Sequence, residues 1–173
     1  MSWPNKEDRE TFEINGFIEH YARLPEKRKF KAVSRGDKPD YVVSCVESGS
    51  EYGVELTSVY LSDRSVPDDH IPNLEGPHEI VDLSFNSRDH DHYKVRLLEA
   101  IEAKIAKAKT GYDRSRPLIL SIYVNEYTSL FLTQEELEQW VKSHQSVFDN
   151  MHPFSEIVLW SLPNGGVFRI RPS

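Results

Sequence analysis

The sequence predicts a single α/β domain in which helices flank a mixed central β-sheet. An apolar stripe at helical spacing opens the chain, two neighbouring runs rich in β-branched and aromatic residues follow, and residues 118–124 are continuously apolar. A chain of 173 residues with 38% hydrophobic residues can bury one ordinary core. We therefore expect residues 1–173 to form one domain.

The first predicted element is a helix over residues 6–24. Its apolar side chains recur at helical spacing, at Ile14, Phe17, Ile18 and Tyr21. Pro25 ends it, because proline has no N–H to donate and clashes with the preceding turn.

A strand pair follows the helix. Residues 40–46 and 52–61 are rich in Val and Tyr, and Ser48-Gly49-Ser50 joins them as a hairpin. Alternation in the second strand places Glu55, Thr57 and Val59 on one face and Val54, Leu56 and Ser58 on the other. The alternation therefore assigns Glu55 and Thr57 to the same side of the sheet.

Residues 62–91 predict a long loop excursion, because prolines, charges and histidines occur there with little periodicity. Asp68-Asp69-His70, His78 and Asp89-His90-Asp91-His92 offer ligands for a transition metal, but their spacing matches no closed zinc pattern. We expect this loop to contact substrate or a partner, and its role stays open.

The remaining elements are a helix over 92–109, a strand over 117–124 covered on both faces, and a C-terminal helix plus hairpin within 133–171. Thr133 and Glu136 form a capping box for a helix that runs towards Phe148. Residues 157–162 and 167–170 flank Pro163-Asn164-Gly165-Gly166, which predicts the closing hairpin.

Charge is unevenly distributed along the chain. The formal net charge of −7 argues against a protein that coats nucleic acid through bulk electrostatics. Even so, residues 23–38 and 94–116 are basic, and residues 47–91 between them are acidic. An acidic centre with basic flanks suits a metal site bordered by a phosphate-binding surface. Solvated helix and loop faces are the alternative interpretation of the same charges.

What the sequence lacks argues against several classes of protein. The N-terminus does not join a basic start to an apolar run, and no apolar stretch approaches the roughly 20 residues of a membrane helix. We expect a cytoplasmic protein with no membrane partner. No glycine-rich phosphate loop, nucleophile elbow or Ser-His-Asp order supports a kinase, an NTPase or a serine hydrolase.

Two acids stand on the adjacent predicted strands, Asp40 at the start of the first and Glu55 within the second. A carboxylate among apolar, β-branched neighbours is costly to desolvate unless a cation or hydrogen-bond donors offset the cost. Carboxylates on neighbouring strands also hold a fixed geometry. This layout predicts a site for Mg²⁺ or Mn²⁺, ions that prefer oxygen ligands and keep open positions for water and phosphate.

The region from the first helix through Val124 resembles the restriction-endonuclease-like fold of the PD-(D/E)XK nuclease superfamily. The motif of that superfamily is an acid after proline and then, on the next strand, an acid, any residue and usually lysine. The matching residues are Pro39-Asp40 and Glu55-Leu56-Thr57. The resemblance implies that Asp40 and Glu55 bind Mg²⁺ or Mn²⁺, that a glutamate of the first helix joins them, and that the chain hydrolyses DNA or RNA.

Thr57 departs from the motif, because a threonine hydroxyl cannot supply the positive charge of the usual lysine. A basic residue from elsewhere would have to replace it. We expect Lys94 first, since helical projection places it on the apolar side of its helix, and Lys104 second, while Lys107 points further away.

On the first helix, Glu10 and Glu13 both lie next to the apolar stripe. We favour Glu13 as the third acid, because Glu13 and Phe17 are four residues apart and share a face. A solvated helix face remains the alternative for both glutamates.

Three functional hypotheses follow. The first is a metal-dependent nuclease with Asp40, Glu55, Thr57, Lys94 and Lys104 as its catalytic set. The second is an inactive relative that binds nucleic acid or protein, and the third is a structural domain whose two acids are merely hydrogen-bonded. A homodimer and a protein partner both remain open, as does the choice between DNA and RNA.

Overall fold

The computed structural model describes residues 5–59, 87–124, 134–161 and 166–173. The elements in chain order are α1 (Lys6–Tyr21), β1 (Phe30–Arg35), β2 (Tyr41–Cys45), β3 (Glu51–Val59), α3 (Ser87–Ala108), β4 (Leu118–Val124), α4 (Gln134–Ser143), α5 (Gln145–Asp149), β5 (Phe154–Ser161) and β6 (Val167–Ile170).

The strands form one six-stranded sheet in the order β1-β2-β3-β4-β5-β6. β3, β4 and β5 are parallel to one another, whereas β1, β2 and β6 join the sheet through antiparallel pairings. The predicted α/β domain with a mixed sheet is therefore confirmed. β4 lies in the interior of the sheet, which is why all seven of its residues are buried.

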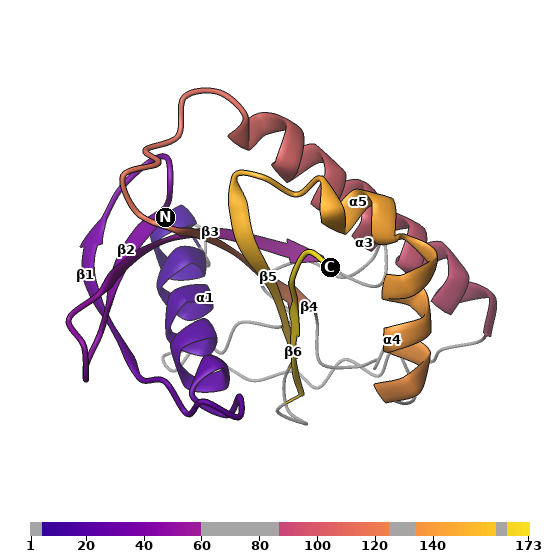
Figure 1. The fold of residues 1–173 in the computed structure, drawn as a ribbon, viewed down its shortest axis with the longest axis horizontal. Coiled ribbons are helices and arrows are strands. Elements are labelled where there is room, and N and C mark those ends of the chain that lie inside the picture. Colours follow the sequence, from indigo (N-terminus) through magenta and orange to yellow (C-terminus); the bar gives the residue numbers. More distant parts are fainter. Residues whose placement is uncertain (1–4, 60–86, 125–133, 162–165) are drawn as a thin grey trace.

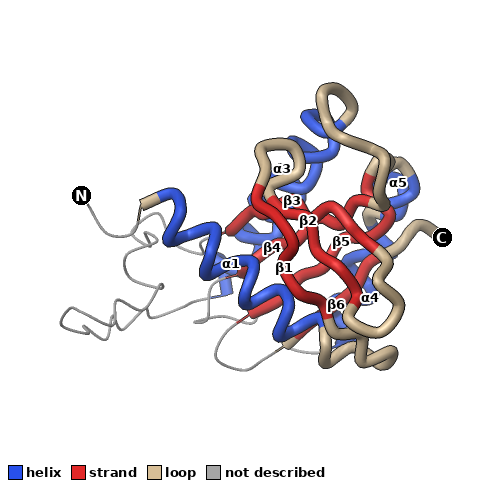
Figure 2. The backbone as a smooth tube through the Cα atoms, turned by 90° about the vertical axis from the view of Figure 1, so that its left-hand side faces the viewer, coloured by secondary structure: helices blue, strands red, loops and turns tan. Residues whose placement is uncertain are grey.

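Helices cover both faces of this sheet, α1 on one side and α3, α4 and α5 on the other (Figures 1 and 2). The core therefore has two parts. The α1-side core includes Ile14, Phe17 and Trp160, and the α3-side core includes Ile101 and Phe148. None of the helices in these described ranges is both long and apolar enough to cross a membrane.

α1 begins at a capping box in which Asn5 and Asp8 each accept a hydrogen bond from the other's backbone N–H. It ends at Tyr21, about one turn before the predicted end, because Pro25 cannot donate the bond that would extend the helix. Gly16 lies against the indole of Trp160. A Cβ at this position would lie 2.1 Å from the nearest ring carbon, so only glycine allows so close an approach.

Two further boundaries differ from the prediction. α3 begins at Ser87 and not at residue 92, so residues 87–91 belong to a helix and not to the expected loop. Residues 87–91 are all polar, so they can form a helix but carry no apolar residues at helical spacing from which the helix could be predicted. The helix expected to run from residue 133 towards Phe148 breaks at His144, just after Ser143 Oγ donates to the Gln139 carbonyl at 2.8 Å, a bond that bends helices.

β1 was not predicted at all. Five of its six residues are exposed, so it has no alternation of buried and exposed positions, and it lies at the edge of the sheet. The closing hairpin is confirmed by the antiparallel pairing of β5 with β6. Some of the sequence predictions fall outside the described residues. These concern Thr133, the turn residues 163–165, and the acids and histidines between residues 62 and 86 that were considered as metal ligands.

Candidate functional site

The candidate site lies where β2 separates from β3. The antiparallel pairing of these strands ends at Tyr41 and Val54, one residue before Asp40 and Glu55, whereas β3 continues beside β4 as far as Val59. In Figure 1 the N-terminal end of α1 and the connection from α3 to β4 lie beside the turn between β1 and β2. The separation of the strands leaves room for side chains from both sides of the sheet.

A pocket of about 380 Å³ occupies this place. The pocket is lined by Lys6, Arg9, Glu10, Glu13, Asp37, Lys38, Asp40, Glu55, Leu56, Thr57, Ser58, Lys104 and Lys107. Six residues named from the sequence as site residues or alternatives are thus brought together: Glu10, Glu13, Asp40, Glu55, Thr57 and Lys104.

Asp40 is held by the backbone of β3. Its Oδ2 accepts a hydrogen bond from the Leu56 N–H at 2.8 Å, so the side chain satisfies a donor at the point where β2 no longer pairs. Burial raises the pKa of Asp40 to about 6, and the negative charge of Glu55 adds to this, while the Leu56 hydrogen bond opposes it. The carboxylate is therefore fixed in position and poorly solvated.

Glu55 is the most deeply buried acid of the pocket, with 2% of its surface exposed. Its Oε1 accepts hydrogen bonds from Lys104 Nζ and from the Tyr112 hydroxyl, each at 2.7 Å. Its Oε2 is buried and has no hydrogen-bond partner. One oxygen is therefore held by two donors, and the other is free for a ligand.

Glu13 reaches the same pocket from α1. It is 8% exposed, and its Oε1 is buried without a hydrogen-bond partner. Burial raises its pKa to about 8, helped by the nearby negative charge of Asp40 and opposed by Lys104. Glu13 is thus a buried acid of the site and not part of a solvated helix face.

Glu10, the other candidate on α1, has a structural partner. Arg35 of β1 donates two hydrogen bonds to its Oε2, one of them from Nε at 2.8 Å, and Lys6 Nζ lies 3.5 Å from its Oε1. Glu10 therefore ties α1 to β1, which leaves Glu13 as the better candidate for a third ligand.

Lys94, the first choice among the candidate amines, is not among the residues that line the pocket. It lies on the partly buried side of α3 as predicted, but its Nζ pairs with Glu136 of α4 at 2.5 Å. Lys104, the second choice, is the amine beside Glu55. Lys107, expected to point further away, also lines the pocket.

Tyr112 was missed by sequence reasoning. It follows α3 in the connection to β4, where no periodicity predicts the direction of a side chain. Its side chain is buried, and burial together with the hydrogen bond to Glu55 raises the pKa of its hydroxyl. Tyr112 therefore stays protonated and donates to Glu55 over the whole physiological pH range.

The donor chemistry of the pocket fits a hard divalent cation. Glu13 and Glu55 each have a buried, unpartnered carboxylate oxygen, Asp40 adds a third carboxylate, and oxygen ligands are those that Mg²⁺ and Mn²⁺ prefer. Among the described residues, however, no three His, Cys, Asp or Glu side chains are grouped closely enough to form a ready metal cluster. Binding would therefore require these carboxylates to draw closer together.

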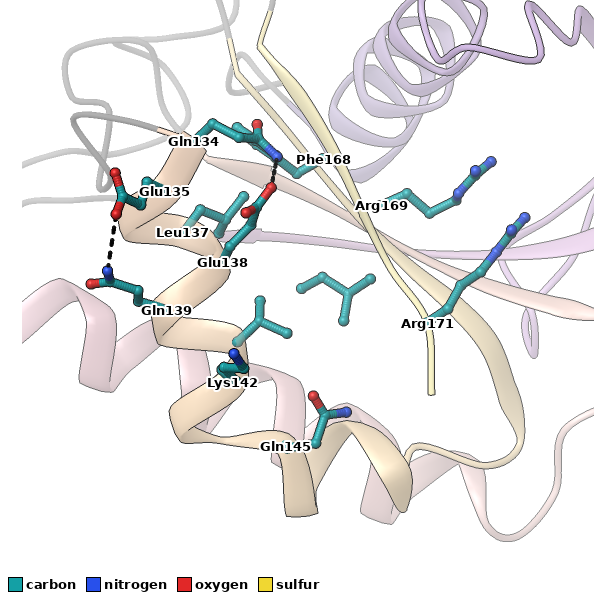
Figure 3. Close-up of a pocket in the computed structure, with 12 residues that line it drawn as sticks. Gln134, Glu135, Leu137, Glu138, Gln139, Lys142, Gln145, Phe168, Arg169 and Arg171 are labelled. Atoms are coloured by element: carbon teal, nitrogen blue, oxygen red, sulfur yellow. Dashed lines mark hydrogen bonds between the residues drawn. The ribbon is translucent and has the colours of Figure 1, made fainter. Parts of the chain in front are cut away.

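A second, larger pocket of about 560 Å³ lies between α4 and β6 (Figure 3). Two of its acids are hydrogen-bonded along the helix, Glu138 to Gln134 at 2.9 Å and Glu135 to Gln139 at 3.4 Å. No described residue that lines it has a buried side-chain oxygen or nitrogen without a partner. It therefore offers less for chemistry than the pocket around Glu55.

A comparison with models of known protein families gives no match, and comparisons with curated proteins and with solved structures find no similar chain. A function can therefore be inferred only from the residues of the pocket. Two features of the pocket bear most on function. One is the position of Lys104 beside Glu55, and the other is the pair of buried, unpartnered carboxylate oxygens of Glu13 and Glu55.

Proposed function

We propose that this chain is a divalent-metal-dependent nuclease that hydrolyses phosphodiester bonds of DNA or RNA. The site would be a variant of the PD-(D/E)XK arrangement on a restriction-endonuclease-like fold, with its lysine supplied by α3. The single observation that supports this most is the environment of Glu55: an amine and a phenol hold one carboxylate oxygen, and the other is buried without a partner beside Asp40 and Glu13.

Asp40, Glu55 and Glu13 would hold Mg²⁺ or Mn²⁺. When bound, such an ion supplies Lewis-acid polarisation of a phosphate oxygen and lowers the pKa of a water molecule. The burial of Glu13 and Glu55 and the partial burial of Asp40 favour this role, because a buried carboxylate gains most from a cation that replaces lost hydration. The Leu56 N–H and the Tyr112 hydroxyl would keep two of the ligands oriented.

Lys104 would supply the positive charge that Thr57 lacks. Its ammonium group lies 2.7 Å from Glu55 Oε1, on the side of β3 to which Glu55 and Thr57 both point. Hydrolysis adds water across one P–O bond: the water oxygen bonds to phosphorus, and the ester oxygen leaves and takes up a proton. An ammonium group in this position would orient the water and offset negative charge that develops on phosphorus.

The second candidate is an inactive relative that binds nucleic acid or protein. One observation favours it: Lys104 already neutralises Glu55, so this carboxylate does not require a metal ion in order to be buried. The two hypotheses differ in what a divalent ion does. Only the nuclease requires it for turnover.

The test is cleavage of plasmid DNA, single-stranded DNA and RNA with Mg²⁺ or Mn²⁺ and with EDTA. We expect metal-dependent cleavage by the wild type and its loss in Asp40→Asn and Glu55→Gln. Activity that survives both substitutions would contradict the proposal. Absence of cleavage on every substrate and with either metal would favour the binding module.

The contribution of Lys104 has a matched control on the same helix. Lys104→Met should lower kcat by about a hundredfold or more, the usual size of a lost proton-transfer or charge-stabilising group, whereas Lys94→Met should leave it unchanged. Circular dichroism and thermal melts would confirm that both variants fold. An equal loss of activity in the two variants would show that Lys104 has no special role.

A further inference from the structure

Five basic and five acidic side chains line the pocket, whereas the whole chain has a formal net charge of −7. The lining of the pocket is therefore formally neutral, so a polyanion meets less repulsion there than the net charge of the chain implies. The basic side chains divide into two groups. Lys6 and Lys104 are paired with carboxylates, whereas Arg9, Lys38 and Lys107 are not.

Arg9, Lys38 and Lys107 reach the pocket from three separate places in the fold. Arg9 lies on α1, Lys38 lies in the connection between β1 and β2, and Lys107 lies near the end of α3. All three are exposed, and in the part of the chain that the structure describes none makes a salt bridge or a side-chain hydrogen bond. Unpaired cations that gather at one pocket indicate an anionic ligand, because each retains its full charge for it.

The depth of Glu55 indicates how such a ligand would lie. A phosphodiester that approached this 2% exposed carboxylate would place one phosphate inside the pocket, whereas the three cations are exposed at the surface. The cations would then be left for phosphates further along the same strand. An isolated phosphodiester or a mononucleotide has no such phosphates.

We propose that Arg9, Lys38 and Lys107 bind the phosphates that flank the one at the carboxylates, so that these three side chains set the position of the strand in the site. This inference rests on the proposed function and adds to it the residues that hold the strand. The three side chains are positioning residues for the strand and take no part in the bond-breaking step.

The test measures binding and not cleavage. Fluorescence anisotropy with labelled oligo-dT and oligo-U octamers and with a labelled dinucleotide would be recorded over a range of monovalent salt, once with EDTA and once with Ca²⁺. The variants are Arg9→Gln, Lys38→Gln and Lys107→Gln. The matched control is Lys142→Gln, an exposed lysine of α4 beside the second pocket (Figure 3).

For a single strand, one lost phosphate contact lowers the slope of log K against log salt by about 0.7, which weakens binding roughly fivefold at about 0.1 M salt. We expect this change in each pocket variant and no change in the control. The dinucleotide should bind much more weakly than either octamer, and its affinity should be the same in all variants. The two octamers show whether DNA or RNA is preferred.

The proposal is overturned if the wild type binds neither octamer or if the dinucleotide binds as tightly as the octamers. It is also overturned if the control variant loses as much affinity for the octamers as the pocket variants do. Its failure is distinguishable from failure of the proposed nuclease. Altered salt slopes without any cleavage would keep the strand-binding role and remove the hydrolysis. Cleavage with unaltered salt slopes would keep the hydrolysis and remove the strand-binding role of the three cations.

Discussion

The protonation of Glu13 should make the stability of the metal-free protein depend on pH. The pKa of Glu13 is about 8 in the folded chain, against an ordinary value of 4.5. Between these two pH values the folded protein keeps the proton and the unfolded chain releases it. Raising the pH therefore favours unfolding, and the free energy of unfolding should fall from about pH 5 to about pH 8 and then level off.

The size of this effect follows from the shift. Each pKa unit corresponds to about 1.4 kcal/mol, so the change from 4.5 to about 8 gives an upper value of about 5 kcal/mol. Asp40, whose pKa rises from 3.8 to about 6, contributes in the same direction at lower pH. Domains of this kind are stable by about 5 to 15 kcal/mol, so the loss should be easily measured.

Glu13→Gln removes the titrating group and keeps its shape. The variant should be about as stable as the wild type at pH 5 and more stable by up to several kcal/mol at pH 8. Urea denaturation followed by circular dichroism in EDTA at pH 5, 6, 7 and 8 would measure this. Glu19→Gln is the control, since Glu19 lies on the same helix but is exposed and pairs with Arg23.

Two results would refute this reasoning. One is a wild-type stability that stays constant between pH 6 and 8. The other is a pH dependence in Glu13→Gln that equals that of the wild type, which would place the titrating group elsewhere.

Further predictions concern packing and the ligands of the site. Gly16→Ala should lower the free energy of unfolding by about 1 to 3 kcal/mol, because the added methyl group overlaps the indole of Trp160; an unchanged urea midpoint would contradict this packing. Tyr112→Phe should lower the free energy of unfolding by about 1 to 2 kcal/mol, since Glu55 loses one of its two hydrogen-bond donors. It should also shift the Mg²⁺ concentration needed for half-maximal activity. Equal Mg²⁺ concentrations for variant and wild type would show that Tyr112 does not orient Glu55 for the ion. Mg²⁺ at pH 8 should raise the melting temperature of the wild type but raise it less in Glu55→Gln, and equal shifts would place the ion elsewhere.

Most of the sheet could be predicted from the sequence, because its strands carry strong local signals. The β2–β3 hairpin and the continuous apolar run of β4 follow from composition and alternation, and the faces assigned to β3 agree with the structure. Val54 and Leu56 pack in the α1-side core, whereas Val59 packs in the α3-side core. β1 gave no such signal because almost all of it is exposed.

The choice of lysine could not be made from the sequence for a geometric reason. Helical periodicity tells which face a residue occupies but not its height along the axis. Lys94 and Lys104 are ten residues apart, which is about 15 Å along a helix. The position of α3 relative to β3 therefore decides which amine meets Glu55, and that position depends on long-range packing.

Asp40 has a consequence for how the site can be observed. Its carboxylate protects the amide of Leu56, a group that backbone pairing would protect in a longer hairpin. The rate at which this amide exchanges its hydrogen with solvent therefore reports on one acid of the site. Hydrogen-exchange spectra could follow the engagement of Asp40 in the resting protein, without substrate, metal or turnover.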